Sequence, residues 1–111
     1  MIPWIVAGLI GGVLLVAFWD EIVNWLKDLI PKIQQAFQAI AHAAAAFIEK
    51  VEKTLAAIRH KLYYKENGQW IEETTTRKIE VSEVPERIRR KLGYGEEEIT
   101  EEVEAELGME L

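Results

Sequence analysis

The distribution of apolar and polar positions divides the chain into three stretches. The first runs from Ile2 to Trp19, and the first charged side chain is Asp20. Eighteen residues without a charge form a helix of about 27 Å, which is enough to cross the hydrocarbon part of a bilayer. Trp4 and Trp19 flank this run, as aromatic rings do at membrane interfaces. The pattern predicts a single transmembrane helix over 2–19.

Glycines inside this run favour contact between two such helices. Gly8 and Gly12 form a Gly-x-x-x-Gly pair, and residues with small side chains let helix backbones approach each other closely in lipid. The alternative is that lipid simply tolerates glycine here. No Lys or Arg precedes the run and several follow it, so the positive-inside rule places the N-terminus outside and the rest of the chain in the cytoplasm.

The second stretch has the periodicity of a helix. Apolar residues recur at steps of three or four from Ile22 to Leu62, with a mean step of about 3.6. The transmembrane helix is therefore expected to continue into one long amphipathic helix over 20–61, kinked near Pro31.

A chain of this size has too few other apolar residues to cover such a stripe. We therefore expect the stripe to pack against copies of itself, as in a homo-oligomeric helical bundle. The predicted oligomerisation residues are Gly8, Gly12, Leu26, Ile33, Phe37, Ile40, Ala44, Phe47, Val51, Leu55 and Ile58.

The third stretch changes to strand and turn signals. Asn67-Gly68 is a strong hairpin turn, because both residues tolerate positive φ, and aromatic and branched residues flank it. A small β-hairpin is expected over 62–81. Ser82 is a candidate cap for a short helix, which an acidic tail follows within 82–111.

Charge is concentrated in this last part. Residues 63–111 contain seven Lys or Arg and fourteen Glu, a net charge of −7, which argues against binding to duplex nucleic acid. Four basic residues nevertheless lie close together and could bind the phosphates of a nucleotide-type ligand, although neighbouring glutamates could equally neutralise them. They are Arg87, Arg89, Arg90 and Lys91.

Catalytic chemistry is not indicated. The chain has no cysteine, no Ser/His/Asp grouping and no phosphate-binding glycine loop, so we predict no enzyme, no cofactor and no metal site. On one helix, His42 and His60 would lie about 27 Å apart, too far to share a metal ion.

The expected fold class is mainly α: a transmembrane helix, a long amphipathic helix, a small β-hairpin and a short helix. Two functions fit this expectation. The first is a pore or channel assembled from copies of the chain and gated by a ligand or partner. The second is a non-conducting membrane anchor or scaffold that recruits a cytoplasmic protein. A third possibility is a soluble assembly that buries the apolar helix. The expected partners are the lipid bilayer, other copies of the chain, and a cytoplasmic protein or nucleotide-type ligand.

Overall fold

The apolar stripe does begin as a helix, but the helix is short. In the computed structural model, which describes residues 16–111, α2 spans Trp19–Ala36 and contains Pro31 without ending there. Its buried residues Ile22, Leu26, Leu29 and Ile33 follow the predicted spacing of three or four positions, and Ile30, next to Leu29, is buried as well. The exposed face carries the Asp28–Lys32 ion pair, 2.8 Å between Oδ2 and Nζ.

The predicted helix over 20–61 is wrong beyond Ala36. The chain turns at residues 37–40 and then forms β2 (His42–Lys50) and β3 (Leu55–Glu66). Residues 41–48 are almost all apolar, so they fit a period of two as well as one of 3.6. Alanine favours a helix by less than about 1 kcal/mol per residue, and tertiary packing overrides such a preference.

The hairpin turn lies where the sequence predicts it, between strands longer than expected. β3 pairs antiparallel with β4 (Gln69–Glu80) over its full length, from Leu55 with Glu80 to Glu66 with Gln69. Asn67 and Gly68 connect them with φ values of 51° and 79°, as a two-residue turn that follows the right-handed strand twist requires.

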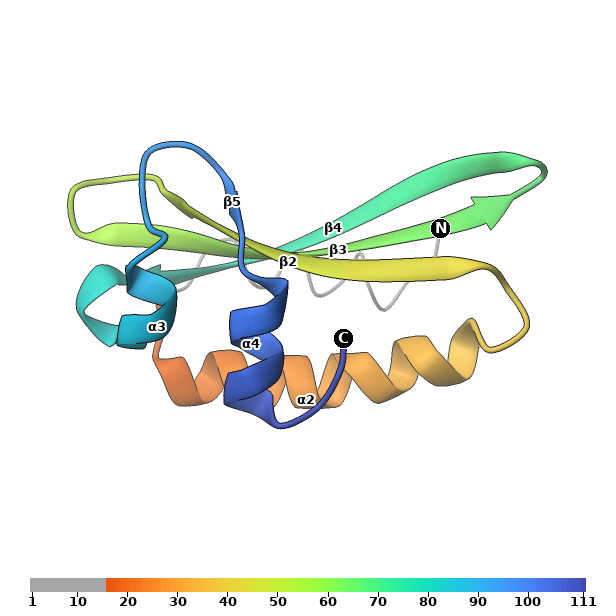
Figure 1. Ribbon diagram of the computed structural model, residues 1–111, viewed down its shortest axis with the longest axis horizontal. Coiled ribbons are helices and arrows are strands. Elements are labelled where there is room, and N and C mark those ends of the chain that lie inside the picture. The colour runs from red at the N-terminus through yellow and green to blue at the C-terminus, as the bar shows by residue number, and fades with distance from the viewer. Residues whose placement is uncertain (1–15) are drawn as a thin grey trace.

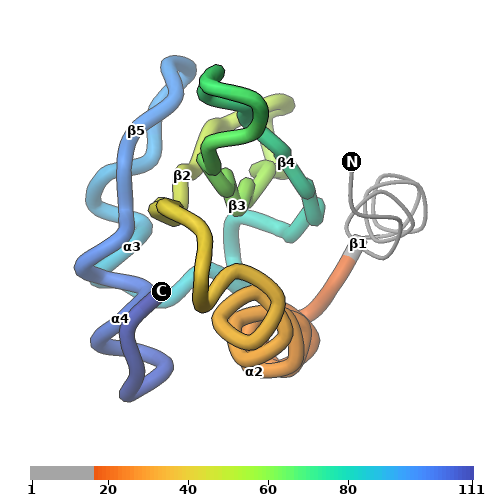
Figure 2. Tube along the Cα trace, turned by 90° about the vertical axis from the view of Figure 1, so that its right-hand side faces the viewer, coloured from red at the N-terminus to blue at the C-terminus, as the bar shows by residue number. Residues whose placement is uncertain are grey.

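The sheet has five strands in the order β1-β4-β3-β2-β5 (Figure 1). β1 (Val16–Ala17) joins β4 in parallel, and β5 (Glu97–Glu98) joins β2 antiparallel. Between β4 and β5 lie a 3₁₀ turn (Val81–Glu83) and α3 (Glu86–Arg89), and α4 (Thr100–Leu107) follows β5. Figure 2 shows α2 along one face of the sheet and β5, α3 and α4 gathered beyond β2.

One face of the sheet packs on α2 and forms the core. Every second residue of β3 points into it: Ala56, Ile58, His60, Leu62 and Tyr64 are buried. α4 closes the side beyond β2 with Val103 and Leu107. Phe37, which is 2 % exposed, covers the end of the core and its ring lies 5.0 Å from that of Tyr64.

This architecture contradicts the predicted mainly α bundle. Val16–Ala17, inside the predicted transmembrane helix, is a strand of the sheet, and α2 starts separately at Trp19. No helix within residues 16–111 is both long and apolar enough to span a bilayer. The predictions of a single-pass topology, a membrane pore and a membrane anchor are therefore not supported. Gly8, Gly12 and most of the span over 2–19 lie outside the described residues.

The predicted apolar stripe from Ile22 to Leu62 also needs no second copy of the chain to cover it. Leu26, Ile33, Phe37 and Ile58 are buried within the one chain. Ala44, Phe47 and Leu55 are half-buried on strands, whereas Ile40 and Val51 are exposed in connections. These residues come from a helix, two strands and two loops, so they do not form the single continuous face that a helical bundle requires.

Candidate interaction surface at the edge of the sheet

The first half of β2 is an open strand edge. Backbone groups of successive residues in a strand point to alternate sides, and in β2 those of the even-numbered residues point away from β3. Ala46 uses both of its outward groups: its N–H donates to Thr100 Oγ1 at 3.1 Å, and its carbonyl accepts from Ile99 N–H at 2.8 Å. Within residues 16–111, no strand pairs with the outward side of His42 or Ala44.

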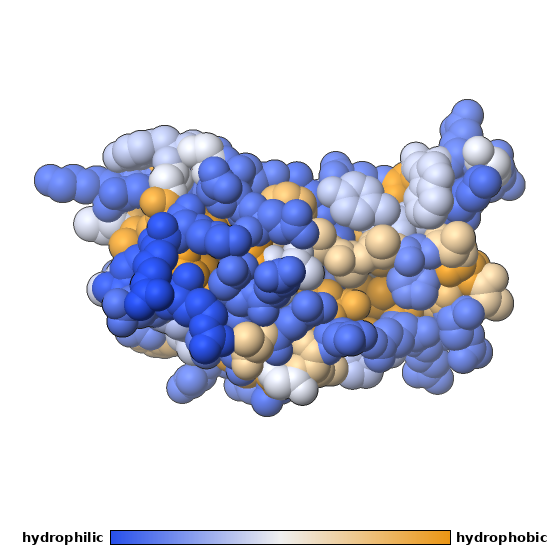
Figure 3. All heavy atoms as spheres, viewed as in Figure 1, coloured by the Kyte–Doolittle hydropathy of each residue, from blue (hydrophilic) through white to orange (hydrophobic). Residues whose placement is uncertain are grey.

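This edge lacks the usual protection against pairing. Natural edge strands carry lysine, proline or a bulge that discourages a further strand. Here the open part is His42-Ala43-Ala44-Ala45, which has small uncharged side chains beside the histidine. In the right-hand half of Figure 3, apolar surface shows between the sheet and α2.

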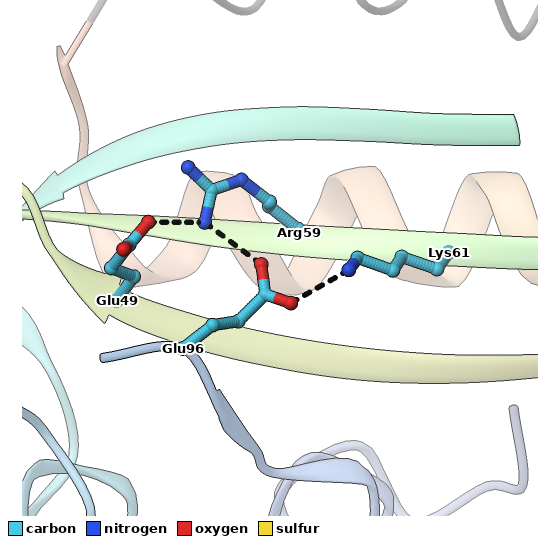
Figure 4. A network of polar contacts seen from close by, with 4 residues as sticks. All are labelled: Glu49, Arg59, Lys61 and Glu96. Atoms are coloured by element: carbon cyan, nitrogen blue, oxygen red, sulfur yellow. Dashed lines mark hydrogen bonds and ion pairs between the residues drawn. The ribbon is translucent and has the colours of Figure 1, made fainter.

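The loop before β5 determines where the open edge ends. In Figure 4 the Glu96 carboxylate lies between two basic side chains of β3 on the sheet face opposite α2. One oxygen lies 3.0 Å from Arg59 Nη1 and the other 2.6 Å from Lys61 Nζ, while Glu49 binds the same Arg59 nitrogen at 2.8 Å. The hydrogen bond from Lys61 is the main reason why the pKa of Glu96 is lowered. Glu96 thus anchors the segment that places β5 against Phe47 and Ile48.

We expect Glu96→Gln to loosen β5 without unfolding the domain. The amide keeps the shape of the side chain but loses the charge that Arg59 and Lys61 bind. Hydrogen exchange should become about tenfold faster at the amides of Ile99 and Lys50, which bond to Ala46 and Gly93 respectively. The matched control is Glu97→Gln, because Glu97 is exposed and forms no ion pair with any described residue. Equal exchange rates in the two variants would show that Glu96 does not anchor this segment.

A small hollow lies beneath the open edge, between β2 and α2. The centre of a water molecule could occupy about 10 Å³ of this hollow. α2 contributes Ile30, Ile33 and Gln34 to its wall, and the other lining residues are His42, Ala44, His60 and Leu111. The structure thus brings together two histidines that a single helix would keep apart. Both histidines have even residue numbers, and the even-numbered side chains of the paired strands β2 and β3 point to the same face of the sheet. Sequence reasoning missed this signal, because it placed both residues on one helix.

His60 is the most unusual side chain in this hollow. It is 2 % exposed, and its Nε2 has no hydrogen-bond partner among residues 16–111. Burial lowers the pKa of His60 from 6.5 to about 4. The ring is therefore neutral at pH 7. Thr75 of β4 pairs with His60 of β3. It is 1 % exposed, and its Oγ1 also lacks a hydrogen-bond partner in the described part of the chain.

Acidic side chains surround the end of the open edge. Residues 93–111 contain eight Glu and no Lys or Arg. Two of these glutamates bind basic residues, Glu96 as described and Glu102 with Lys91 at 3.1 Å. The other six form no ion pair with a described residue: Glu97, Glu98, Glu101, Glu104, Glu106 and Glu110. β5 and α4 therefore present negative charge beside the open edge.

The predicted anion-binding residues lie on and after α3, with α4 between them and the open edge (Figure 1). Three of them bind groups of the same chain: Arg89 Nε donates to the Val84 carbonyl at 3.2 Å, Arg90 pairs with Glu86 at 3.4 Å, and Lys91 pairs with Glu102. Arg87 is exposed. Anion binding by this cluster stays a prediction.

No group of three or more His, Asp or Glu in residues 16–111 is arranged to hold a metal ion.

The chain matches no known protein family, no characterised protein and no solved structure.

Proposed function

We propose that this domain is a non-catalytic binding module that takes an extended segment of a partner protein as an additional strand on β2. The observation that supports this most directly is that no described strand pairs with the outward side of His42 and Ala44, which lies next to a hollow between β2 and α2. In β-strand addition, main-chain hydrogen bonds supply affinity, and pockets for alternate side chains supply specificity.

Charge indicates which kind of segment would bind. The open edge contains no Asp, Glu, Lys or Arg. It ends at Ala46, where β5 and α4 begin to cover β2 and bring glutamates that form no ion pair with a described residue. A partner strand with lysine or arginine would be attracted to this end, whereas an acidic strand would be repelled. We therefore infer a basic, extended peptide segment as the partner.

A suitable probe is an acetylated nine-residue peptide in which lysine alternates with valine. We expect it to bind the domain and to slow hydrogen exchange at the amides of His42 and Ala44. Exchange at Ala43 and Ala45 should hardly change, because their amides already point toward β3. A twin peptide with glutamate in place of lysine should bind about tenfold more weakly at low salt.

Ala44→Pro tests the strand pairing itself. Proline removes the outward N–H, which bonds to no other described residue, so the fold should tolerate it at this edge. We expect at least about a tenfold loss of peptide affinity, because a ladder hydrogen bond is lost and the ring obstructs the edge. Ala44→Ser is the matched control: it keeps the N–H and nearly the same size, and should bind within about threefold of the parent.

Results of two kinds would contradict the proposal. One is binding of the peptide with protection elsewhere in the domain, or no binding at all. The other is protection of the His42 and Ala44 amides that increases with protein concentration when no peptide is present, since this would identify a second copy of the chain as the occupant.

A further inference from the structure

The segment after α4 folds back toward the open edge. α4 is followed by Gly108, which has a φ of 70° in the left-handed region and whose N–H donates to the Glu104 carbonyl at 2.9 Å. Three residues later, the N–H of Leu111 donates to the Glu104 carboxylate at 3.0 Å. In Figure 1 this segment rises in front of α2 toward β2. Glu104 thus holds both ends of the turn that returns Leu111 to the body of the domain.

Leu111 forms part of the wall of the hollow beneath the open edge. It shares this wall with Ile30 and Ile33 of α2 and with Ala44 of β2, and it is itself half-buried against the core. Apart from Gln34 and the two histidines, the described residues that line the hollow are therefore aliphatic. Such a lining favours an apolar group over a charged one.

The size of the hollow restricts what it can hold. The 10 Å³ open to the centre of a water molecule is at the lower limit for one water. A strand added to β2 would point every second side chain toward α2, on the face where His42 and Ala44 lie. A short side chain at this position requires only a small shift of the wall, whereas a large one overpacks it.

The wall residue best placed to set this limit is Leu111. The other described lining residues belong to α2, β2 or β3 and are fixed by the pairing and packing of those elements, whereas Leu111 lies outside any helix or strand. Its side chain can therefore be shortened with little effect on the sheet or on α2.

We propose that Leu111 determines the size of the side chain that the partner strand places beside Ala44. The favoured residue there has a short aliphatic side chain, such as that of valine, and an aromatic residue is excluded by contact with Leu111. The lysines attracted to the acidic end of the edge occupy the alternate positions, which point away from α2. The partner segment is thus an extended strand in which basic residues alternate with short aliphatic ones.

This inference rests on the proposed function, and the nine-residue peptide of alternating lysine and valine tests it. Each valine is replaced in turn by phenylalanine. At one position the replacement should weaken binding to the unmodified domain by at least about fivefold, because the larger ring overpacks the hollow. In Leu111→Ala the same replacement should weaken binding by less than about twofold, since the variant lacks the obstructing side chain.

Met109→Ala is the matched control. Met109 belongs to the same segment and is half-buried against the core, but it is not among the described residues that line the hollow. This variant should keep the full loss of affinity that phenylalanine causes in the unmodified domain.

A direct measurement supplements the variants in case one of them does not fold. The methyl ¹³C signals of Leu111 in the unmodified domain should shift when the valine peptide binds. Unchanged Leu111 signals, tolerance of phenylalanine at every position, or an equal loss in Leu111→Ala would overturn the role of Leu111 alone, provided that the peptide still protects the amides of His42 and Ala44. Failure of every peptide to protect these amides would overturn the proposed function, and the size selection with it.

Discussion

Acidification from pH 7 to pH 5 is expected to destabilise this domain by about 2 kcal/mol through His60 alone, and by about 3 kcal/mol at pH 4. The folded-state pKa is about 4, below the ordinary value of 6.5. Between these values the unfolded chain binds the proton more readily than the folded chain does. The stabilising effect is therefore complete above pH 6.5 and is lost as the pH falls toward 4.

The side chains around His60 agree with burial as the main cause of its lowered pKa. Ala46 of β2 is apolar, Thr75 of β4 is neutral, and α2 contributes Ile30, Ile33 and Gln34 to the shared hollow. On the same face, β4 places Glu73 and Arg77 two positions on either side of Thr75, and β2 places His42 in the hollow. Their charges are not among the causes of the shift, which is dominated by desolvation.

Urea unfolding at a series of pH values measures this effect. The range from pH 7 to pH 5 separates His60 from Glu96, whose lowered pKa makes its contribution disappear only at more acidic pH. His60→Leu should show a nearly constant unfolding free energy over this range. His42→Gln, which changes the other histidine of the hollow, should keep the loss seen in the parent. If His60→Leu and the parent lose stability equally, His60 is not the group responsible.

Phe37→Ala should destabilise the domain by about 3–5 kcal/mol, which is a large fraction of the 5–15 kcal/mol by which domains are usually stable. Phe37 is 2 % exposed and packs against the rings of Tyr64 and His42, with centroid distances of 5.0 and 5.6 Å. Removing its ring leaves a cavity that the surrounding strands and helix can close only in part.

The control for this experiment comes from the same apolar stripe. Ile40 lies three residues further on but is 42 % exposed, so Ile40→Ala should change stability by less than about 0.5 kcal/mol. Both effects should be independent of protein concentration, because Phe37 packs within one chain. A loss that is similar in both variants and that depends on concentration would instead show that the stripe packs between copies.

The candidate site could not be predicted from sequence because it depends on strand order. Ala44 and His60 are sixteen positions apart, and only the pairing of β2 with β3 brings them to one hollow. Whether an edge is open depends in turn on how far β5 extends, and its end is set by contacts such as that of Thr100 with Ala46. Contacts between residues so distant in the chain leave no local pattern.

The sequence by itself determined the elements whose signals are local. The spacing of Ile22, Leu26 and Ile33 predicted an amphipathic helix, and Asn67-Gly68 predicted the turn between β3 and β4, because only a few residue types tolerate positive φ. The tertiary structure decided the conformation of residues 41–62. The almost uniformly apolar run over 41–48 fits the period of a helix and that of a strand, and the free energy of burying Ile48, Ile58 and Leu62 under α2 outweighs the helix preference of alanine and selects the sheet.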